Sequence, residues 1–255
     1  MLGILAYPRT GSTLIYEVLK QHYSENSSVR CIGEAFNPVE FRKLIIDRDG
    51  LSLIPVSNTS NVPQSREERF SLVYNSVHKS LRVQNNTQND YILKVLPQDL
   101  RYEPIFDFIK NHYKRLIVTK RRDVIDTILS ALIAMEHRRF NDNDNNFTYH
   151  KFEAKIVEVE WLCFLHNHFN SFVSKLLPNV IVELYYEDII RMNRCDIIQH
   201  CGLVPNDNDD GPLPLVKLLK KEDKIPLITN INEVLRTISA NIVLDNLDIS
   251  SYNLT

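Results

Sequence analysis

Short apolar runs that alternate with longer amphipathic segments are the feature that most constrains this chain. Five runs of strand length recur, and apolar residues fall at helical spacing between most of them. The runs are residues 2–6, 29–32, 91–96, 116–118 and 179–184. Such alternation is typical of an α/β fold whose helices connect the strands of a mostly parallel sheet. We therefore predict a doubly wound, five-stranded sheet flanked by helices, with ligands outside the carboxyl ends of its strands.

Segments of helical period connect the apolar runs. Ser12 or Thr13 is expected to cap the first helix, and Asp99 the helix that runs to about residue 113. Further helices are expected at 64–82, from 123 to 134, from about 152 to 176, and at 231–235. The polar stretches 141–146 and 206–214 are expected to be a loop and a connection.

The size and composition of the chain fit one domain, residues 1–255, whose core needs neither a disulfide nor a structural metal. Thirty basic residues stand against 32 acidic ones, a formal net charge of −2, so the basic excess of a general nucleic-acid binder is missing. The four cysteines lack zinc-site spacing, and the eight histidines form no metalloprotease pattern. We expect no metal site and no nucleic-acid partner.

The apolar segments are too short for a membrane protein. None reaches the roughly 18 consecutive apolar residues of a membrane span. The first residues carry no basic segment of the kind that begins a signal peptide. A soluble, cytoplasmic protein without a membrane partner is the resulting expectation.

The residues that follow the first predicted strand read Tyr-Pro-Arg-Thr-Gly-Ser-Thr-Leu and open the first predicted helix. Free N–H groups at a helix N-terminus, and a dipole end worth about half a charge, favour an anion there. Gly11 permits close approach to the backbone, Thr10, Ser12 and Thr13 offer hydroxyls, and Arg9 adds a permanent charge. The Walker A pattern of ordinary ATP and GTP hydrolases is absent. The loop predicts phosphate or sulfate binding; the alternative is a capped turn with an exposed arginine.

A second group of cations ends the fourth predicted strand. Lys120, Arg121 and Arg122 stand where this strand meets the next helix, and Ser130 lies two helical turns further on. The carboxyl ends of parallel strands meet at one edge of a sheet, so these cations are expected beside the first loop. A guanidinium group can hold two phosphate oxygens at once. The sequence therefore predicts a second anion site.

The first loop resembles the 5′-phosphosulfate loop of sulfotransferases that use 3′-phosphoadenylyl sulfate. Its arginine form is similar to tyrosylprotein sulfotransferases and to bacterial carbohydrate sulfotransferases of the trehalose type. The resemblance spans about residues 2–205 and implies the P-loop-like α/β fold of that family. In that family an Arg, with a Ser eight or nine residues later, holds the 3′-phosphate. This implies Ser130 with Arg121, nine residues earlier as in the bacterial trehalose type, or with Arg122, eight residues earlier; we expect Arg121. The segment Tyr-Tyr-Glu-Asp after the fifth run resembles a family motif whose Tyr lies against adenine, which implies Tyr186.

The resemblance also bears on the base that would take the acceptor's proton. Val95 occupies the position of the catalytic His of many cytosolic sulfotransferases. The Gly-Glu that ends the second run resembles the Gly-Glu of the tyrosylprotein and bacterial types, which implies Glu34 as general base; the alternative is a surface carboxylate in a turn. Lys94 is expected either to add a charge behind this site or to be a solvated lysine at a strand end.

The resemblance implies transfer of a sulfuryl group from 3′-phosphoadenylyl sulfate to a hydroxyl, on a carbohydrate or another small molecule, without a metal. Arg9 would then hold the bridging oxygen of the leaving nucleotide. The alternatives are a P-loop-like phosphotransferase and a non-catalytic nucleotide-binding relative. The family's late Arg-Lys-Gly phosphate clamp is absent; the charged residues 220–224 either substitute for it loosely or, as we rather expect, form a solvated cluster. Bacterial carbohydrate-type relatives can be dimeric, so a homodimer is one expectation.

Overall fold

The computed structural model describes residues 1–24, 29–34, 36, 44–47, 50–53, 90–137, 148–213 and 221–242, with single positions between 65 and 75. The predicted helix at 64–82 lies largely outside the described residues, and the predicted loop at 141–146 lies wholly outside them.

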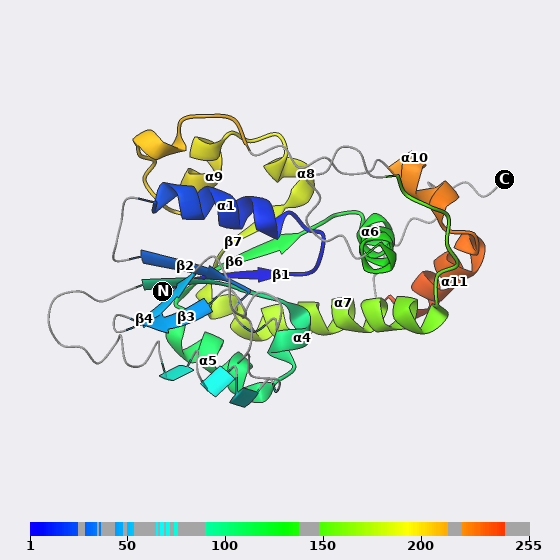
Figure 1. Cartoon of the computed structure of the whole chain (residues 1–255), viewed down its shortest axis with the longest axis horizontal. Coiled ribbons are helices and arrows are strands. Elements are labelled where there is room, and N and C mark those ends of the chain that lie inside the picture. The colour runs from blue at the N-terminus through cyan, green and yellow to red at the C-terminus, as the bar shows by residue number, and fades with distance from the viewer. Residues whose placement is uncertain are drawn as a thin grey trace, which may run out of the picture.

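A five-stranded parallel sheet forms the centre of the molecule (Figure 1). Its strands are β1 (Leu2–Ala6), β2 (Val29–Gly33), β5 (Asp90–Val95), β6 (Arg115–Lys120) and β7 (Val180–Tyr185). Their order is β2-β5-β1-β6-β7, and every neighbouring pair is parallel. The predicted α/β fold and its five strands are confirmed, each within about two residues of the sequence estimate.

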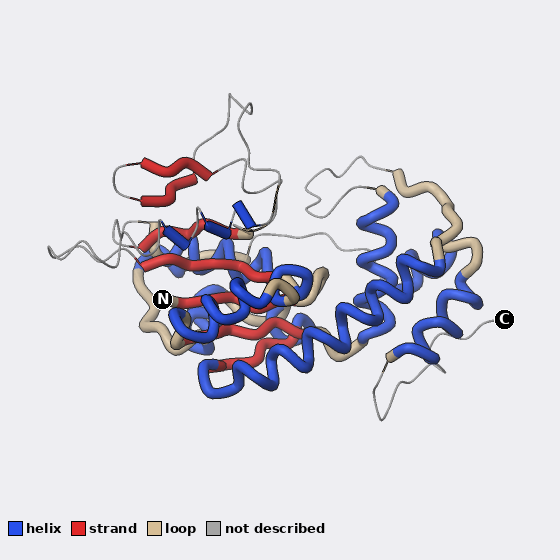
Figure 2. The backbone as a smooth tube through the Cα atoms, turned by 90° about the horizontal axis from the view of Figure 1, so that it is seen from below, coloured by secondary structure: helices blue, strands red, loops and turns tan. Residues whose placement is uncertain are grey.

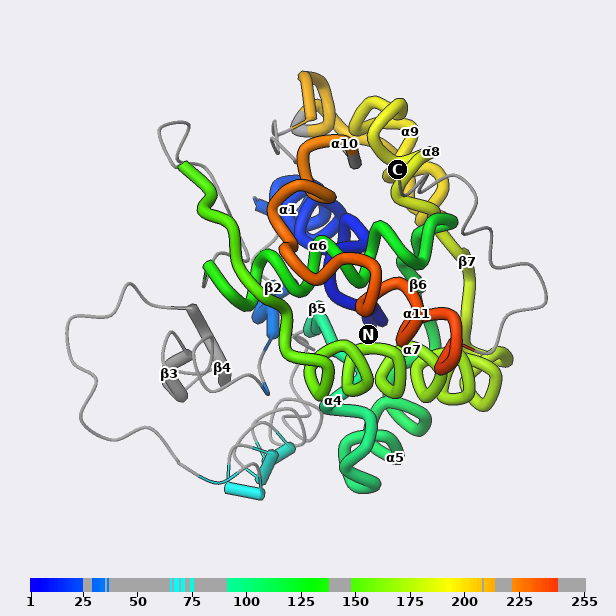
Figure 3. Tube along the Cα trace, turned by 90° about the vertical axis from the view of Figure 1, so that its right-hand side faces the viewer, coloured from blue at the N-terminus to red at the C-terminus, as the bar shows by residue number. Residues whose placement is uncertain are grey.

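Helices cover both faces of this sheet (Figures 1 and 2). One face carries α1 (Ser12–His22), α8 (Tyr186–Ile189) and α9 (Arg194–His200). The other carries α4 (Pro97–Leu100), α5 (Glu103–His112) and the long α7 (Ile156–Leu176). Beyond the carboxyl ends of the strands lie α6 (Val124–Glu136), α10 (Lys221–Lys224) and α11 (Ile231–Asn241), with α7 running beneath them (Figure 3).

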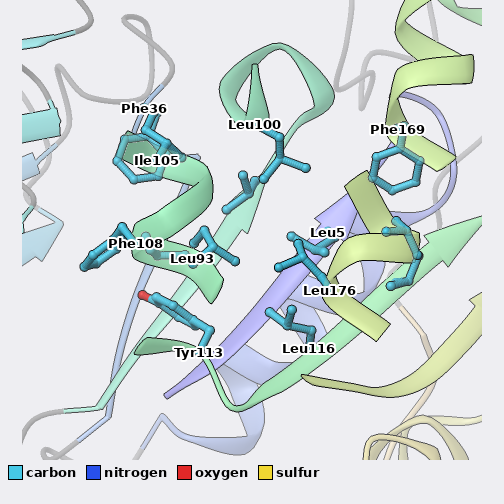
Figure 4. Packing of buried hydrophobic residues seen from close by; sticks show 14 of the residues in the cluster. Leu5, Phe36, Leu93, Leu100, Ile105, Phe108, Tyr113, Leu116, Phe169 and Leu176 are labelled. Carbon is cyan, nitrogen blue, oxygen red and sulfur yellow. The ribbon is translucent and has the colours of Figure 1, made fainter. Parts of the chain in front are cut away.

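Three groups of buried side chains hold these layers together. The first lies between the sheet and helices α5 and α7, and it includes Leu93 of β5, Phe108 of α5 and Phe169 of α7 (Figure 4). The second packs α1 and α9 on the opposite face, and the third joins α6, α7 and α11. Every residue of β1 is buried, as expected for a central parallel strand covered on both faces.

Several predicted boundaries are wrong for local reasons. Neither Ser12 nor Thr13 caps α1, because Gly11 occupies the N-cap position and α1 has no side-chain cap. Asp99 lies inside the short α4, where its carboxylate accepts from the Leu96 N–H, and α5 starts afresh at Glu103. Proline lacks an N–H and disfavours a helical residue before it, so Pro104 suits the first turn of a new helix.

The remaining differences concern lengths and one missed element. The helix expected from about residue 152 begins at 156, and the terminal helix runs on to residue 241. An antiparallel pair, β3 (Leu44–Asp47) and β4 (Gly50–Leu53), was not predicted.

Candidate active site

The order of the strands brings the two predicted anion sites to one place. After β1 the chain builds β2 and β5 on one side of that strand, and then β6 and β7 on the other. The loops that follow the adjacent strands β1 and β6 therefore open at the same sheet edge, at the point where the strand order reverses. Ligands of doubly wound folds bind at such a point.

The loop after β1 has an unusual backbone. Arg9 has φ 67° and is the only described non-glycine residue with a positive φ, while Gly11 has φ 81°. An L side chain in this region crowds the following carbonyl, so strained positions of this kind cluster at functional sites. A Cβ on Gly11 would lie 3.1 Å from the ring of Tyr186. The loop is thus folded tightly between the start of α1 and the residue that follows β7.

Two of the predicted hydroxyls are engaged within the protein. The Thr10 hydroxyl, almost fully buried, donates to the Tyr7 carbonyl over 2.7 Å and lies 2.8 Å from the Thr119 hydroxyl on β6. It therefore fastens the loop to β6, and an anion could reach Thr10 only through its backbone N–H. Ser12 is also buried. The Thr13 hydroxyl accepts a hydrogen bond from Lys94.

Lys94 links Glu34 to the first loop. Its ammonium lies 2.7 Å from Oε1 of Glu34 and 3.1 Å from the Thr13 hydroxyl. The Lys94 and Glu34 side chains are 10% and 18% exposed, so the solvated strand-end alternative for Lys94 is wrong. A carboxylate, an ammonium and the first turn of α1 therefore form one continuous hydrogen-bonded group.

The sequence around Glu34 places it beside Lys94. Strand β2 pairs with β5, with Gly33 opposite Leu93, so the ends of the two strands are neighbours. Gly33 has φ 61°, which turns the chain as it leaves β2. Phe36, two residues after Glu34, is buried in the core cluster beneath α5. The turn and this anchor together hold Glu34 at the carboxyl edge of the sheet.

Of the three consecutive basic residues at the end of β6, Lys120, Arg121 and Arg122, Arg121 is the most buried, with its side chain 11% exposed. Its guanidinium contacts the Asp126 carboxylate and lies 4.7 Å from the centre of the Tyr186 ring. Arg122 is 54% exposed and makes a two-pronged contact with Asp188 at 2.9 and 2.6 Å. This geometry favours Arg121 over Arg122 as the cation of the second anion site.

Tyr186 lies between the two predicted anion sites. Burial raises the pKa of Tyr186, while the positive charges of Arg121 and Arg9 act in the opposite direction. One phenol thus experiences both arginines, which places them around the same residue. Ser130 is buried on α6, two turns beyond the start of that helix.

Two charged residues of this region were missed by the sequence analysis. Lys224 is 3% exposed, and its ammonium lies 2.6 Å from Oδ1 of Asp126, so its assignment to a solvated cluster is wrong. Asp126 is itself 4% exposed. Asp126 interrupts an apolar helical run, and Lys224 precedes the apolar residues Ile225 and Leu227. A lone charge in an apolar context needs a buried partner, and this signal could have identified both.

The described residues also bear on metals, membranes and disulfides. Among them we find no group of three or more His, Cys, Asp or Glu side chains that could hold a metal ion. None of the helices in the described ranges combines the length and apolar character of a membrane span. All four cysteines have free thiols.

Comparison with known proteins assigns the family. Residues 2–203 match the model of the Sulfotransferase family. This match covers most of the 255 residues, and the chain therefore belongs to the sulfotransferase family. No curated protein matched the chain in a sequence search. The resemblance to the bacterial carbohydrate and tyrosylprotein types stays a prediction.

Proposed function

We propose that this protein transfers a sulfuryl group from 3′-phosphoadenylyl sulfate to a hydroxyl of a carbohydrate or a similar small molecule. One observation carries the proposal: Lys94 joins Glu34 to the first turn of α1, directly after the predicted anion-binding loop, at 2.7 Å from the carboxylate and 3.1 Å from the Thr13 hydroxyl. A candidate base thus lies directly beside the place where a sulfuryl group would be held.

The two ends of the donor fit the two groups of cations. The 5′-phosphosulfate would lie at the loop of Arg9 and Gly11, where the N-terminus of α1 supplies free N–H groups and a favourable dipole. The 3′-phosphate would lie against Arg121, with Ser130 on the following helix. Tyr186 lies between the loop and Arg121, the position expected of the residue that faces the adenosine.

The transfer step needs little covalent chemistry from the protein. The acceptor oxygen attacks sulfur, and the bond between sulfur and the bridging oxygen of the donor breaks. The bridging oxygen keeps the electron pair and leaves as part of 3′-phosphoadenosine 5′-phosphate, while the acceptor proton passes to a carboxylate oxygen of Glu34. Arg9 and Lys94 would stabilise the negative charge that develops on the leaving group.

Glu34 and Lys94 would work as a pair. The ammonium donates to the carboxylate and so fixes its orientation, which is the requirement for proton transfer from a bound hydroxyl. The same ammonium donates to the Thr13 hydroxyl, so it connects the base to the first turn of α1.

A transfer assay tests the proposal against its alternatives. The protein is incubated with donor carrying labelled sulfate and a panel of carbohydrate and small-molecule hydroxyl acceptors, and in parallel with labelled ATP and Mg²⁺. We expect labelled sulfate on at least one acceptor and no transfer from ATP. Phosphate transfer from ATP would instead indicate a phosphotransferase. Binding of 3′-phosphoadenosine 5′-phosphate without any transfer would indicate a non-catalytic relative.

A further inference from the structure

The carboxylate of Asp126 engages two cations from distant parts of the chain. Its Oδ2 contacts Arg121 at the end of β6, and its Oδ1 lies 2.6 Å from Nζ of Lys224. Side chains of all three residues are at most 11% exposed. Lys224 lies outside the range 2–203 that matches the family model.

The trio of Asp126, Arg121 and Lys224 is not needed to hold α10 in place. The chain just after Lys224 is fixed independently, because the backbone of Phe152 pairs with Leu227 at 2.9 Å and with Thr229 at 2.8 Å. Ile225 and Leu227 also pack against the cluster that joins α6, α7 and α11. Lys224 is therefore carried to Asp126 by a segment that other contacts already hold.

The charges of the trio point to an anionic ligand. With all three groups ionised, the two cations and one carboxylate sum to +1 in a largely buried place, where an unbalanced charge is costly. Glu187, whose carboxylate lies 3.8 Å from Arg121, brings this sum to zero, and Arg9, whose positive charge also lowers the pKa of Lys224, brings it back to +1. A bound phosphate would balance the remaining charge.

Lys224 belongs electrostatically to the same region as the first loop. Burial lowers the pKa of Lys224; Asp126 raises it, while the charges of Arg121 and Arg9 lower it further. Among the described residues, these three groups face the ammonium from the loop after β1, the end of β6 and the first turn of α6. The positive charges of both predicted anion sites therefore act on Lys224, and Asp126 is in direct contact with both Arg121 and Lys224.

We propose that Asp126 is a positioning residue of the donor site: it holds Arg121 and Lys224 side by side as a two-cation clamp for one phosphate of the nucleotide. This inference rests on the proposed function, since it names the groups that would hold the 3′-phosphate. It also assigns part of the donor site to residues 221–224, beyond the range of the family match.

The direction in which Asp126→Asn changes nucleotide affinity distinguishes a positioning role from a purely electrostatic one. Removing a carboxylate next to a bound phosphate removes a repulsion, so Asp126→Asn should strengthen nucleotide binding if Asp126 acts only through its charge. If Asp126 positions the clamp, the same variant should weaken binding, because the amide NH2 replaces one carboxylate oxygen and either Arg121 or Lys224 loses the acceptor that orients it. We expect affinity for adenosine 3′,5′-bisphosphate, which is another name for 3′-phosphoadenosine 5′-phosphate, to fall about tenfold. This is about the contribution of one charge-assisted hydrogen bond.

The pH dependence of binding gives a second readout that a purely structural role would not move. Without Asp126, burial and the two arginines are no longer opposed, so the pKa of Lys224 should fall further below its ordinary value. Affinity in Asp126→Asn should therefore decline at a lower pH than in wild type. Asp126→Asn combined with Lys224→Arg should lose this pH dependence, because arginine stays charged.

Titration calorimetry with adenosine 3′,5′-bisphosphate and with adenosine 5′-monophosphate, across a pH series, tests the clamp. The variants are Asp126→Asn, Lys224→Met and Asp126→Asn/Lys224→Arg. The matched controls change two exposed residues, Asp107→Asn on α5 and Lys20→Met on α1. Circular dichroism and thermal unfolding establish that each variant is folded. We expect Asp126→Asn and Lys224→Met to lower affinity for the bisphosphate more than for the monophosphate, and the controls to match wild type.

The outcomes distinguish this inference from the proposed function. Tighter or unchanged bisphosphate binding by folded Asp126→Asn and Lys224→Met would overturn the clamp alone. An equal loss for the two nucleotides would also overturn it, because the clamp would then not read the 3′-phosphate. Failure of wild type to bind the bisphosphate at all would overturn the proposed function and the clamp together.

Discussion

At the scale of single residues, the site depends on residues whose backbone conformation or burial costs free energy of folding. Arg9 adopts a left-handed backbone conformation, and Lys94, Asp126 and Lys224 are charged groups with less than a tenth of their surface exposed. Costs of this kind persist only where the surroundings impose them, and here the buried charges are paired. The residues of the proposed site thus include a strained backbone position and several buried charges, both of which are unfavourable for folding by themselves.

Two substitutions of Arg9 distinguish the cost of its backbone conformation from its role in nucleotide binding. We expect Arg9→Ala and Arg9→Gly to lose nucleotide binding alike, because both remove the guanidinium. Glycine tolerates a positive φ, so Arg9→Gly should exceed Arg9→Ala in free energy of unfolding by about 1 kcal/mol. Urea denaturation of the two variants gives this difference. Equal stability would show that the loop relaxes when the arginine side chain is lost.

Glu34 and Lys94 should act on transfer rather than on folding. Glu34→Gln keeps a hydrogen-bond acceptor for Lys94 but removes the base, so transfer should fall about 10²–10⁴-fold while nucleotide affinity stays near that of wild type. Rates of sulfate transfer and calorimetry on the same preparations measure the two effects. Unchanged turnover would remove Glu34 from the mechanism.

A double-mutant cycle tests whether Glu34 and Lys94 form one unit. Each residue contacts the other at 2.7 Å, so the losses in transfer from Glu34→Gln and Lys94→Met should not add in the double variant. The same cycle with Lys20→Met in place of Lys94→Met, an exposed lysine on α1, should be additive. Additive losses for Glu34 and Lys94 would argue that they act separately.

At the scale of elements, the sequence identified every strand of the main sheet but fewer of the helix ends. The strands were visible because central parallel strands are apolar on both faces, as the fully buried β1 shows. The start of α1 was misjudged because a hydroxyl is the usual cap, whereas Gly11 takes that position with a positive φ that no local pattern predicts. The predicted helix from Asp99 is divided because Pro104 opens a new one.

Position 11, in the tight turn into α1, should not tolerate a side chain. Gly11→Ala adds a Cβ to a residue with a φ of 81°, and this Cβ would lie 3.1 Å from the Tyr186 ring. We therefore expect the free energy of unfolding to fall by at least about 1 kcal/mol, and nucleotide affinity to fall as well. Gly202→Ala is the matched control, with a φ of 67° and a Cβ that meets only the flexible end of Arg115 at 3.2 Å.

Both glycine variants should lose stability, and only Gly11→Ala should lose nucleotide binding. Thermal unfolding and calorimetry on the two proteins give the comparison. A Gly11→Ala variant that binds as tightly as Gly202→Ala would show that the loop after β1 does not touch the nucleotide.

At the scale of the whole molecule, the candidate site draws on segments that are far apart in the sequence. Glu34 and the loop at Arg9 could be placed from motifs, because each follows a recognisable strand. The contact between Lys224 and Asp126 could not, because the two residues are 98 positions apart and only tertiary packing brings them together. The choice between Arg121 and Arg122, open at the level of sequence, depends likewise on Asp188, which engages Arg122.

Titration of 3′-phosphoadenosine 5′-phosphate into wild type, Arg9→Ala and Arg121→Ala is the most direct test of the central claim, that one donor nucleotide lies between the loop after β1 and the end of β6. We expect wild type to bind and both variants to lose at least about tenfold in affinity, since each loses a charge-assisted hydrogen bond to a phosphate. Equal affinity in all three folded proteins would contradict the account.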